Sequence, residues 1–397
     1  MTKCKELPLD DIVTMIDYRG KTPKKSTSGI PLITAKIIKN GRIYTPTEFI
    51  SEDEYVERMT RGFPQIGDIL ITTEAPLGEV AELRDAHVAM GQRIITMHAN
   101  KNLICGKYLK YYLLSHEGQS KLRQRESGTT VTGIKQAELR KVLIPLPPLY
   151  VQQRISRILD TLDDKIELNE KINQNLEAQA QAIFKSWFID FEPFKNGKFI
   201  DSELGKIPEG WKVGKLSDIA NITMGQSPNG NSYNEKKIGM IFFQGRAEFG
   251  WRFPRNRLYT TAPKRIAERD SVLLSIRAPV GDINKALERC CIGRGLASLT
   301  SNHKTFLYYK MQSIRHLLDV YNGEGTVFGS INKNTLQEIR TIIPIDSEII
   351  RFELKLKVVD ELIRNNYIEN LRLIKLRDTL LPELMSGKID ILRFSNR

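Results

Sequence analysis

The chain has 397 residues, a mass of 45.4 kDa and a formal net charge of +13 at pH 7. Hydrophobic residues make up 41% of it, which is enough to bury the cores of two or three domains and excludes a globally disordered chain. No apolar stretch approaches the ~18 residues of a membrane-spanning helix, and the acidic start lacks the apolar core of a secretory signal. The four cysteines are few and irregularly spaced, so we expect reduced thiols and a cytoplasmic protein.

The positive charge is concentrated in two blocks of the chain. Residues 1–150 carry 22 Lys and Arg against 17 acids, a net of +5, and residues 201–346 carry 21 against 14, a net of +7. The segments after each block are nearly neutral. A basic excess of this kind favours a polyanionic partner, and nucleic acid comes first among these.

Short motifs recur in the same order in the two halves of the chain. Residues 9–12 (LDDI), 75–78 (APLG) and 128–130 (GTT) are matched by residues 216–219 (LSDI), 278–281 (APVG) and 325–327 (GTV). The offset drifts from 207 residues (9 to 216) to 197 residues (128 to 325), so the repeat is a whole domain with its connector. Each copy mixes short apolar runs, turn signals and a helical patch. We expect an α+β chain with two similar α/β domains.

Each copy is followed by a stretch that predicts a long helix with a coiled-coil seam. Residues 151–191 contain no Gly or Pro, and apolar residues recur there at alternating spacings of three and four, as they do in residues 347–391. Asparagines occupy seam positions 197 residues apart in the two stretches, and polar seam residues fix register. The expected seam positions are Leu162, Ile166, Asn169, Asn173 and Leu176, with Val359, Ile363, Asn366, Asn370 and Leu373. We expect a pseudo-twofold axis between the two copies, which would make this coiled coil antiparallel.

These patterns give a linear domain map. We expect a first domain at residues 1–150, a helix at 151–191, a linker at 192–206, a second domain at 207–346, a second helix at 347–391 and a tail at 392–397.

The sequence carries no recognisable catalytic motif. Residues 20–22 (GKT) resemble the end of a phosphate-binding loop, but Met15 stands where its first glycine is required. The five histidines are scattered, without the Cys and His spacing of a metal site. The Pro147-Pro148 pair lacks the polar neighbour of an amino-methyltransferase motif. We therefore expect a non-catalytic chain with no metal ion and no cofactor of its own.

Basic and polar loops in both copies suit the recognition of duplex DNA. Lys and Arg bind phosphates, and Arg, Gln, Ser and Thr can bind base edges, although a single basic side chain is more often a solvated surface residue. The candidates are Arg19, Lys21, Thr22, Lys24, Lys25, Lys36, Arg42, Gln92, Arg93, Thr129, Thr130 and Lys135 in the first copy, and Gln226, Ser227, Gln244, Arg246, Arg252, Arg277, Arg294 and Thr326 in the second. Arg252 belongs to a basic and aromatic run, 251–257, that has no clear counterpart in the first copy. The copies share scaffold residues but differ in these polar ones, as expected if each reads a different sequence.

Three further segments identify a protein family more specifically than these loops do. They are residues 184–191 (FKSWFIDF), 207–211 (IPEGW) and 380–389 (LLPELMSGKI). With them, nearly the whole chain resembles the specificity (S) subunit of type I restriction-modification systems. One departure is Gly295, which stands where the first copy has Arg93, so that this contact either belongs to Arg294 or is lost.

The resemblance implies a non-catalytic subunit that binds double-stranded DNA in a sequence-specific way. Each target recognition domain would read one half of a bipartite, asymmetric target, and the two helices would set the gap between the halves. The resemblance also implies two methyltransferase (modification) subunits, which supply S-adenosylmethionine chemistry on adenine, and restriction/translocase subunits in the full complex.

Two alternatives remain open from the sequence. One is a specificity subunit of another multi-subunit restriction or methylation system. The other, from a different class, is a coiled-coil scaffold that does not bind DNA, which would explain the helices but not the paired basic loops.

Overall fold

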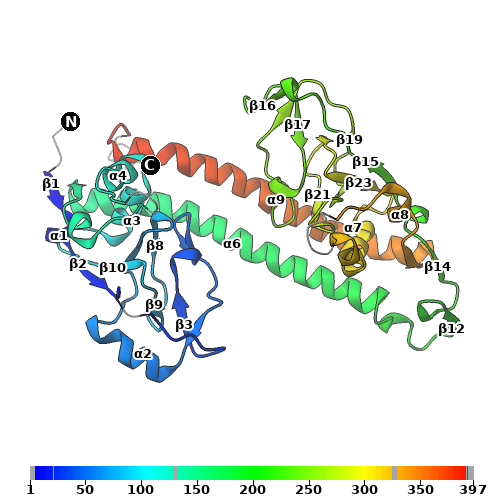
Figure 1. Ribbon diagram of the computed structural model, residues 1–397, viewed down its shortest axis with the longest axis horizontal. Coiled ribbons are helices and arrows are strands. Elements are labelled where there is room, and N and C mark those ends of the chain that lie inside the picture. Colours follow the sequence, from blue (N-terminus) through cyan, green and yellow to red (C-terminus); the bar gives the residue numbers. More distant parts are fainter. Residues whose placement is uncertain (1–4, 21, 129–131, 324–328, 390, 392–397) are drawn as a thin grey trace. The chain divides into compact units, whose positions relative to one another are not determined.

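The computed structural model describes residues 5–20, 22–128, 132–323, 329–389 and 391 (Figure 1). The chain divides into two compact units, residues 1–168 with 369–397 and residues 169–368. Each unit holds one mixed domain of strands and helices. Each also holds part of both long helices, α6 (Leu149–Phe188) and α9 (Asp346–Met385).

The domain of the first unit is built on a four-stranded antiparallel sheet. Its strand order is β2 (Val13–Asp17), β10 (Ile94–Ala99), β7 (Ile69–Thr73) and β8 (Leu77–Glu82). All five residues of β7 are buried, because Ile69 and Ile71 enter one hydrophobic core and Leu70 enters another on the opposite face. Helix α3 (Gly106–Leu114) contacts β7 and β8 and covers the first of these cores.

Smaller elements complete this unit. Strand β3 (Ile30–Ile33) is antiparallel to its neighbour β6 (Phe49–Ile50) and parallel to its other neighbour β9 (Ala89–Met90). The others are β1 (Lys5–Pro8) paired with β11 (Leu143–Leu146), the hairpin of β4 (Ile38–Lys39) and β5 (Arg42–Ile43), and the helices α1 (Leu9–Ile12), α2 (Glu52–Arg58), α4 (His116–Arg123) and α5 (Gln136–Leu139).

The domain of the second unit repeats this plan. Its four-stranded sheet has the order β15 (Asn221–Met224), β23 (Leu296–Thr300), β20 (Val272–Ser275) and β21 (Ile283–Lys285). As in β7, alternate residues of β20 enter two cores, Val272 and Leu274 on one face and Leu273 on the other. Helix α7 (Lys304–Ser313) contacts β20 and β21.

A second sheet in this unit has five strands. Its order is β16 (Tyr233–Asn234), β18 (Tyr259–Thr260), β17 (Met240–Phe243), β22 (Cys290–Ile292) and β19 (Ile266–Ala267). Strand β17 runs parallel to β22, as β3 runs parallel to β9 in the first unit. The remaining elements are β14 (Lys212–Lys215) paired with β24 (Arg340–Ile343), the hairpin of β12 (Phe199–Ser202) and β13 (Gly205–Pro208), and helix α8 (Lys333–Gln337). The shared strand order confirms the predicted fold class, an internal repeat of two similar domains in an α+β chain.

The long helices pair within each unit. In the second unit Asn173 Nδ2 donates to the Ile363 carbonyl (3.0 Å), and Asn366 Nδ2 donates to Asn173 Oδ1 (2.9 Å). In the first unit Asn370 Nδ2 donates to the Ile166 carbonyl (3.1 Å). Residue numbers fall along α9 as they rise along α6, which confirms the antiparallel coiled coil. None of the ten expected seam residues is exposed.

Both ends of the helices follow from local chemistry. Helix α6 begins directly after Pro147-Pro148. An earlier start would require a helical hydrogen bond from the backbone N–H of these residues, which proline lacks. Helix α9 ends at Met385, shortly before Gly387, whose φ of 69° lies in the left-handed region typical of helix C-termini.

Candidate nucleic-acid interface

Loops that are far apart in the sequence meet at one end of the first sheet. The register pairs Asp17 with Ile95 and Thr72 with Ile94, so β2 and β7 end where β10 begins. Residues 18–20, 22–29, 74–76 and 91–93 therefore emerge together, and we call them the first loop cluster. Within it Gln92 Nε2 donates to Thr22 Oγ1 (2.8 Å).

The cations of the first loop cluster lie at its surface. The Arg93 side chain is 55% exposed and its Nε lies 2.8 Å from Glu74 Oε1. Arg19 Nε donates to Asp17 Oδ2 (2.8 Å), Lys25 Nζ lies 3.0 Å from Glu48, and Lys24 is exposed. Because exposed ion pairs contribute little to stability, Lys25 and Arg93 can exchange their carboxylates for phosphates at small cost.

Two more predicted residues flank this cluster. Lys36 is exposed on the turn after β3, whose Ile33 carbonyl accepts a hydrogen bond from Gly91 N (2.7 Å). Lys135 is exposed directly after Ile134, whose N donates to the Thr73 carbonyl (2.9 Å).

The second sheet forms a matching set of loops. Met224 pairs with Ala297 and Ser275 with Leu296, so β15 and β20 end where β23 begins. We call residues 225–232, 244–246, 276–282 and 293–295 the second loop cluster. Backbone bonds connect its loops, since Gln226 N donates to the Ile292 carbonyl (3.0 Å).

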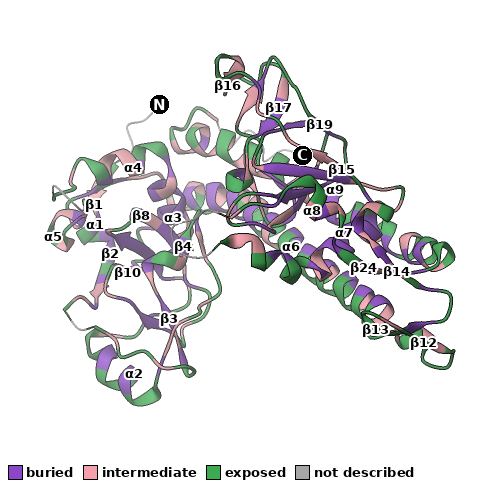
Figure 2. Ribbon diagram, turned by 45° about the vertical axis from the view of Figure 1, so that its right-hand side comes forward, coloured by how far each residue is buried: buried purple, intermediate pink, exposed green. Residues whose placement is uncertain are grey.

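Most predicted residues of the second copy lie in this cluster. Ser227 Oγ accepts from Arg294 N (3.2 Å), and the Gln244 carbonyl accepts from Gly295 N (3.2 Å). Gln226, Gln244, Arg277 and Arg294 are exposed, whereas strands β17 and β20, which lead into the loops of Gln244 and Arg277, are largely buried (Figure 2).

The Gly295 position cannot hold a second arginine. A Cβ there would lie 2.9 Å from the Gln244 carbonyl oxygen and 3.1 Å from Gly245 Cα. The backbone of the second loop cluster therefore excludes a side chain where the first copy has Arg93. The neighbouring Arg294 is exposed and is the cation that this strand offers.

Two arginines belong to the clusters without having been predicted. Arg61 donates to the Arg19 carbonyl (3.0 Å) and also to that of Asp17, and so holds the first loop in place. Arg315 Nη2 lies 2.7 Å from Asp282, the carboxylate that also binds Arg246, so two cations share one acid. No sequence motif marks either residue, because both come from elements outside the repeated loops.

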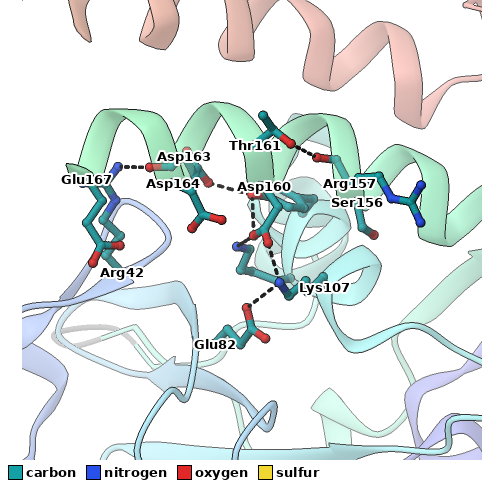
Figure 3. Close-up of polar contacts among 12 residues, drawn as sticks. Arg42, Glu82, Lys107, Ser156, Arg157, Asp160, Thr161, Asp163, Asp164 and Glu167 are labelled. Carbon is teal, nitrogen blue, oxygen red and sulfur yellow. Dashed lines mark hydrogen bonds and ion pairs between the residues drawn. The ribbon is translucent and has the colours of Figure 1, made fainter. Parts of the chain in front are cut away.

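Two residues that we expected to bind DNA, Arg42 and Arg252, point toward the long helices, and for Arg252 the expectation was wrong. Arg42 Nη2 donates to the Asp163 carbonyl of α6 (3.1 Å; Figure 3), and Arg252 is 1% exposed and ion-paired with Glu177 and Asp360. The buried Arg252 guanidinium cannot reach a DNA groove, whereas the half-buried Arg42 side chain is directed toward α6 and its role in DNA binding stays a prediction. Lys21, Thr129, Thr130 and Thr326 lie outside the described residues.

The described parts of the chain offer no sign of metal chemistry or of a membrane span. Among them no three His, Cys, Asp or Glu side chains are placed to hold a metal ion. No helix in these parts is both long enough and apolar enough to cross a bilayer.

Comparison with known proteins identifies the family. The sequence profile of the type I restriction modification DNA specificity domain matches residues 1–178 and again residues 208–376. The chain is 34% identical, over 96% of its length and 93% of the relative's, to a putative type I restriction enzyme MjaX specificity subunit of Methanocaldococcus jannaschii. The MjaIX specificity subunit of the same organism is 31% identical over 91% of this chain and 87% of its own.

A solved structure has the same fold. The type I restriction-modification system S subunit from M. genitalium superposes with a TM-score of 0.64 at 16% identity, over 97% of both chains. The two profile matches cover most of the chain and coincide with the two halves of the internal repeat. The chain belongs to the family of type I restriction-modification DNA specificity subunits.

Proposed function

We propose that this chain reads a bipartite, asymmetric sequence in double-stranded DNA, one half with the domain of residues 1–150 and the other with that of residues 207–346. The observation that carries the proposal is the pair of loop clusters. They emerge from the same end of equivalent sheets but present different polar side chains. Because the two sheets are equivalent but their loops carry different side chains, we expect the two domains to bind different half-sites of the DNA target.

The side chains divide by chemistry into two roles. Arg93 and Arg294 can bind guanine bidentately, and Gln92 and Gln226 can bind adenine in the same way. Exposed lysines and arginines at the edges of the clusters suit phosphates, which position the protein without reading sequence. The phosphate candidates are Arg19, Lys24, Lys25, Lys36, Lys135, Arg246 and Arg277. Thr22, Ser227 and Gln244 can bind either kind of group, and Lys21, Thr129, Thr130 and Thr326 complete the two sets.

Membership of the family supports the rest of the proposal. In the cytoplasm two methyltransferase subunits bind the chain and supply S-adenosylmethionine chemistry on adenine, and restriction/translocase subunits join for cleavage. The chain itself contributes no cofactor and no reacting group. Its paired helices set the number of unspecified bases between the two half-sites.

The test uses the chain co-expressed with the methyltransferase subunit of its own system. We predict adenine methylation at one bipartite sequence, and none from either protein alone. Arg93→Ala and Arg294→Ala are each expected to weaken specific duplex binding by about 1–3 kcal/mol and to relax base preference in one half-site only.

Arg289→Ala is the matched control, because Arg289 is an exposed arginine paired with Glu268 at the other end of β22 from the second loop cluster. It should change neither half-site. Methylation by the chain alone, or a single uninterrupted target, would contradict the proposal.

A further inference from the structure

Arg42 and Arg252 occupy matching places in the two units. Each follows a strand that pairs in parallel, β3 in the first unit and β17 in the second. Each also follows a turn of 3-10 helix, residues 35–37 and residues 246–248. The run 251–257, which has no sequence counterpart in the first copy, thus takes the same place in chain order as the β4–β5 hairpin of the first unit.

The two arginines bind matching residues on the long helices. Arg42 binds the backbone carbonyl of Asp163 on α6, and Arg252 binds the carboxylate of Asp360 on α9. Asp163 and Asp360 are 197 residues apart, the same offset as the paired asparagines Asn173 and Asn370. An arginine from each domain therefore reaches the same point of the repeated helix.

Arg252 contacts both long helices at once. Besides Asp360 on α9 it binds Glu177 on α6, and Tyr309 Oη lies 3.1 Å from its Nη1. Its guanidinium carbon lies 4.5 Å from the ring centre of Tyr308. A planar guanidinium can bind two carboxylates and stack on an aromatic ring at the same time, which a lysine cannot do.

The buried charges around Arg252 balance one another. Lys285 Nζ lies 2.6 Å from Asp360, and Thr305 Oγ1 donates to the same carboxylate (2.9 Å). Burial raises the pKa of the Asp360 carboxyl, but the charges of Lys285 and Arg252 outweigh this effect and leave that pKa below its ordinary value. Two cations and two carboxylates thus form a neutral cluster, in which loss of one member leaves a buried charge unpaired.

The backbone around Arg252 is held on both sides. The Arg252 carbonyl accepts from Lys285 N (2.8 Å) in β21, and Asn284 exchanges two hydrogen bonds with Gly250 (3.0 Å each). Phe253 is buried against Tyr367 of α9, with ring centres 4.9 Å apart. The backbone bonds hold Arg252 rigidly in its own domain, so a rotation of this domain on the helices of its unit must break the Phe253–Tyr367 contact and the Arg252 ion pairs.

We propose that Arg252 is a positioning residue that fixes the angle of the second recognition domain on α6 and α9, and that it thereby sets the gap between half-sites without touching DNA. The inference rests on the proposed function. Arg42, which donates to the Asp163 carbonyl of α6, has the same role in the first unit.

The experiment maps adenine methylation by the complex with the methyltransferase subunit on a duplex library in which the gap length is randomised. The variants are Arg252→Met and the double variant Glu177→Gln/Arg252→Met. The double variant removes one charge of each sign and keeps Lys285 paired with Asp360. We expect unchanged bases in both half-sites, and methylation at gaps one base shorter or longer to rise about tenfold, which corresponds to roughly 1.4 kcal/mol.

Arg289→Met serves as the control and should keep the wild-type gap. An unchanged gap in an active double variant would overturn the proposal, as would altered bases in the second half-site. Loss of all methylation by both variants would also overturn it, since Arg252 would then act through the stability of the domain. Failure of the proposed function would be visible separately, because the wild-type complex would give no bipartite site.

Discussion

Lys310 is a buried cation to which no acid is paired in the described parts of the chain. It lies on α7 and is 5% exposed. Burial lowers the pKa of its ammonium group from 10.5 to about 8. In α3, the corresponding helix of the first unit, the buried Lys110 has Asp160 at 3.3 Å. Burial of the Lys310 ammonium group therefore destabilises the second domain. In the first domain, the carboxylate of Asp160 compensates for the burial of Lys110.

The burial of Lys310 predicts a stabilising substitution with a defined pH dependence. The unfolded chain binds the Lys310 proton more tightly than the folded chain, so stability rises with pH between about 8 and 10.5. We predict that Lys310→Met raises the free energy of unfolding by up to about 3 kcal/mol at pH 7. The gain should shrink as the pH rises from 8 toward 10, which urea unfolding at several pH values would measure.

Lys333→Met provides the comparison, since Lys333 is exposed on α8 of the same domain. That substitution should have little effect at any of these pH values. If Lys310→Met gives the same gain at pH 7 and at pH 10, the ammonium group is not the source of the destabilisation.

The buried asparagines of the helix pair determine the register of α9 along α6. Asn173 donates to the Ile363 carbonyl in one unit and Asn370 to the Ile166 carbonyl in the other, and both pairs are related by the offset of 197 residues. A slip of α9 along α6 would leave buried amides without acceptors. Polar seam residues therefore lower stability but exclude alternative registers.

We predict that Asn173→Leu/Asn370→Leu raises the thermal midpoint of the chain while permitting a slipped register. Lys165 Nζ and Glu369 lie 3.5 Å apart, so a zero-length carbodiimide cross-link between them reports the native register. Mass spectrometry should show less of this cross-link in the double variant, with new cross-links from Lys165 to other acids of α9.

Gln179→Leu tests whether added hydrophobicity alone has this effect, because Gln179 is exposed on α6. It should leave the cross-link unchanged. A more stable double variant with the native cross-link pattern would show that the asparagines do not select the register.

The elements of this fold were predictable because their signals are periodic or repeated. Matched motifs revealed the two domains, and the spacing of three and four revealed the seam. The compact units nevertheless cut both helices, at residues 168 and 368. In an antiparallel pair the first half of α6 packs with the second half of α9, and a linear domain map cannot express that.

The partners of individual arginine side chains could not be predicted from the sequence in the same way. Arg42 and Arg252 have the residue type and loop setting of DNA ligands, yet tertiary packing directs both toward carboxylate-bearing turns of the long helices. Buried arginine is rare unless it is paired, and the pairing acids are far away in sequence. Only the fold shows that Glu177 and Asp360 converge on one guanidinium.

At the scale of the whole molecule, one scaffold is used twice with different loops. The strand orders of the two four-stranded sheets agree, whereas the loops differ: Gln92 and Arg93 of the first loop cluster are replaced by Arg294 and Gly295 in the second. This arrangement lets each domain change its half-site without disturbing the sheet beneath it. The proposed function thus requires that the two halves of the target be independent.

Exchange of one domain tests this independence most directly. Residues 1–150 would be replaced by the matching residues of the 34% identical M. jannaschii relative, and methylated adenines would be mapped after co-expression with the methyltransferase subunit. We predict that one half-site changes while the other half-site keeps its bases. A change in both half-sites, or in neither, would contradict the account of two separate readers in one chain.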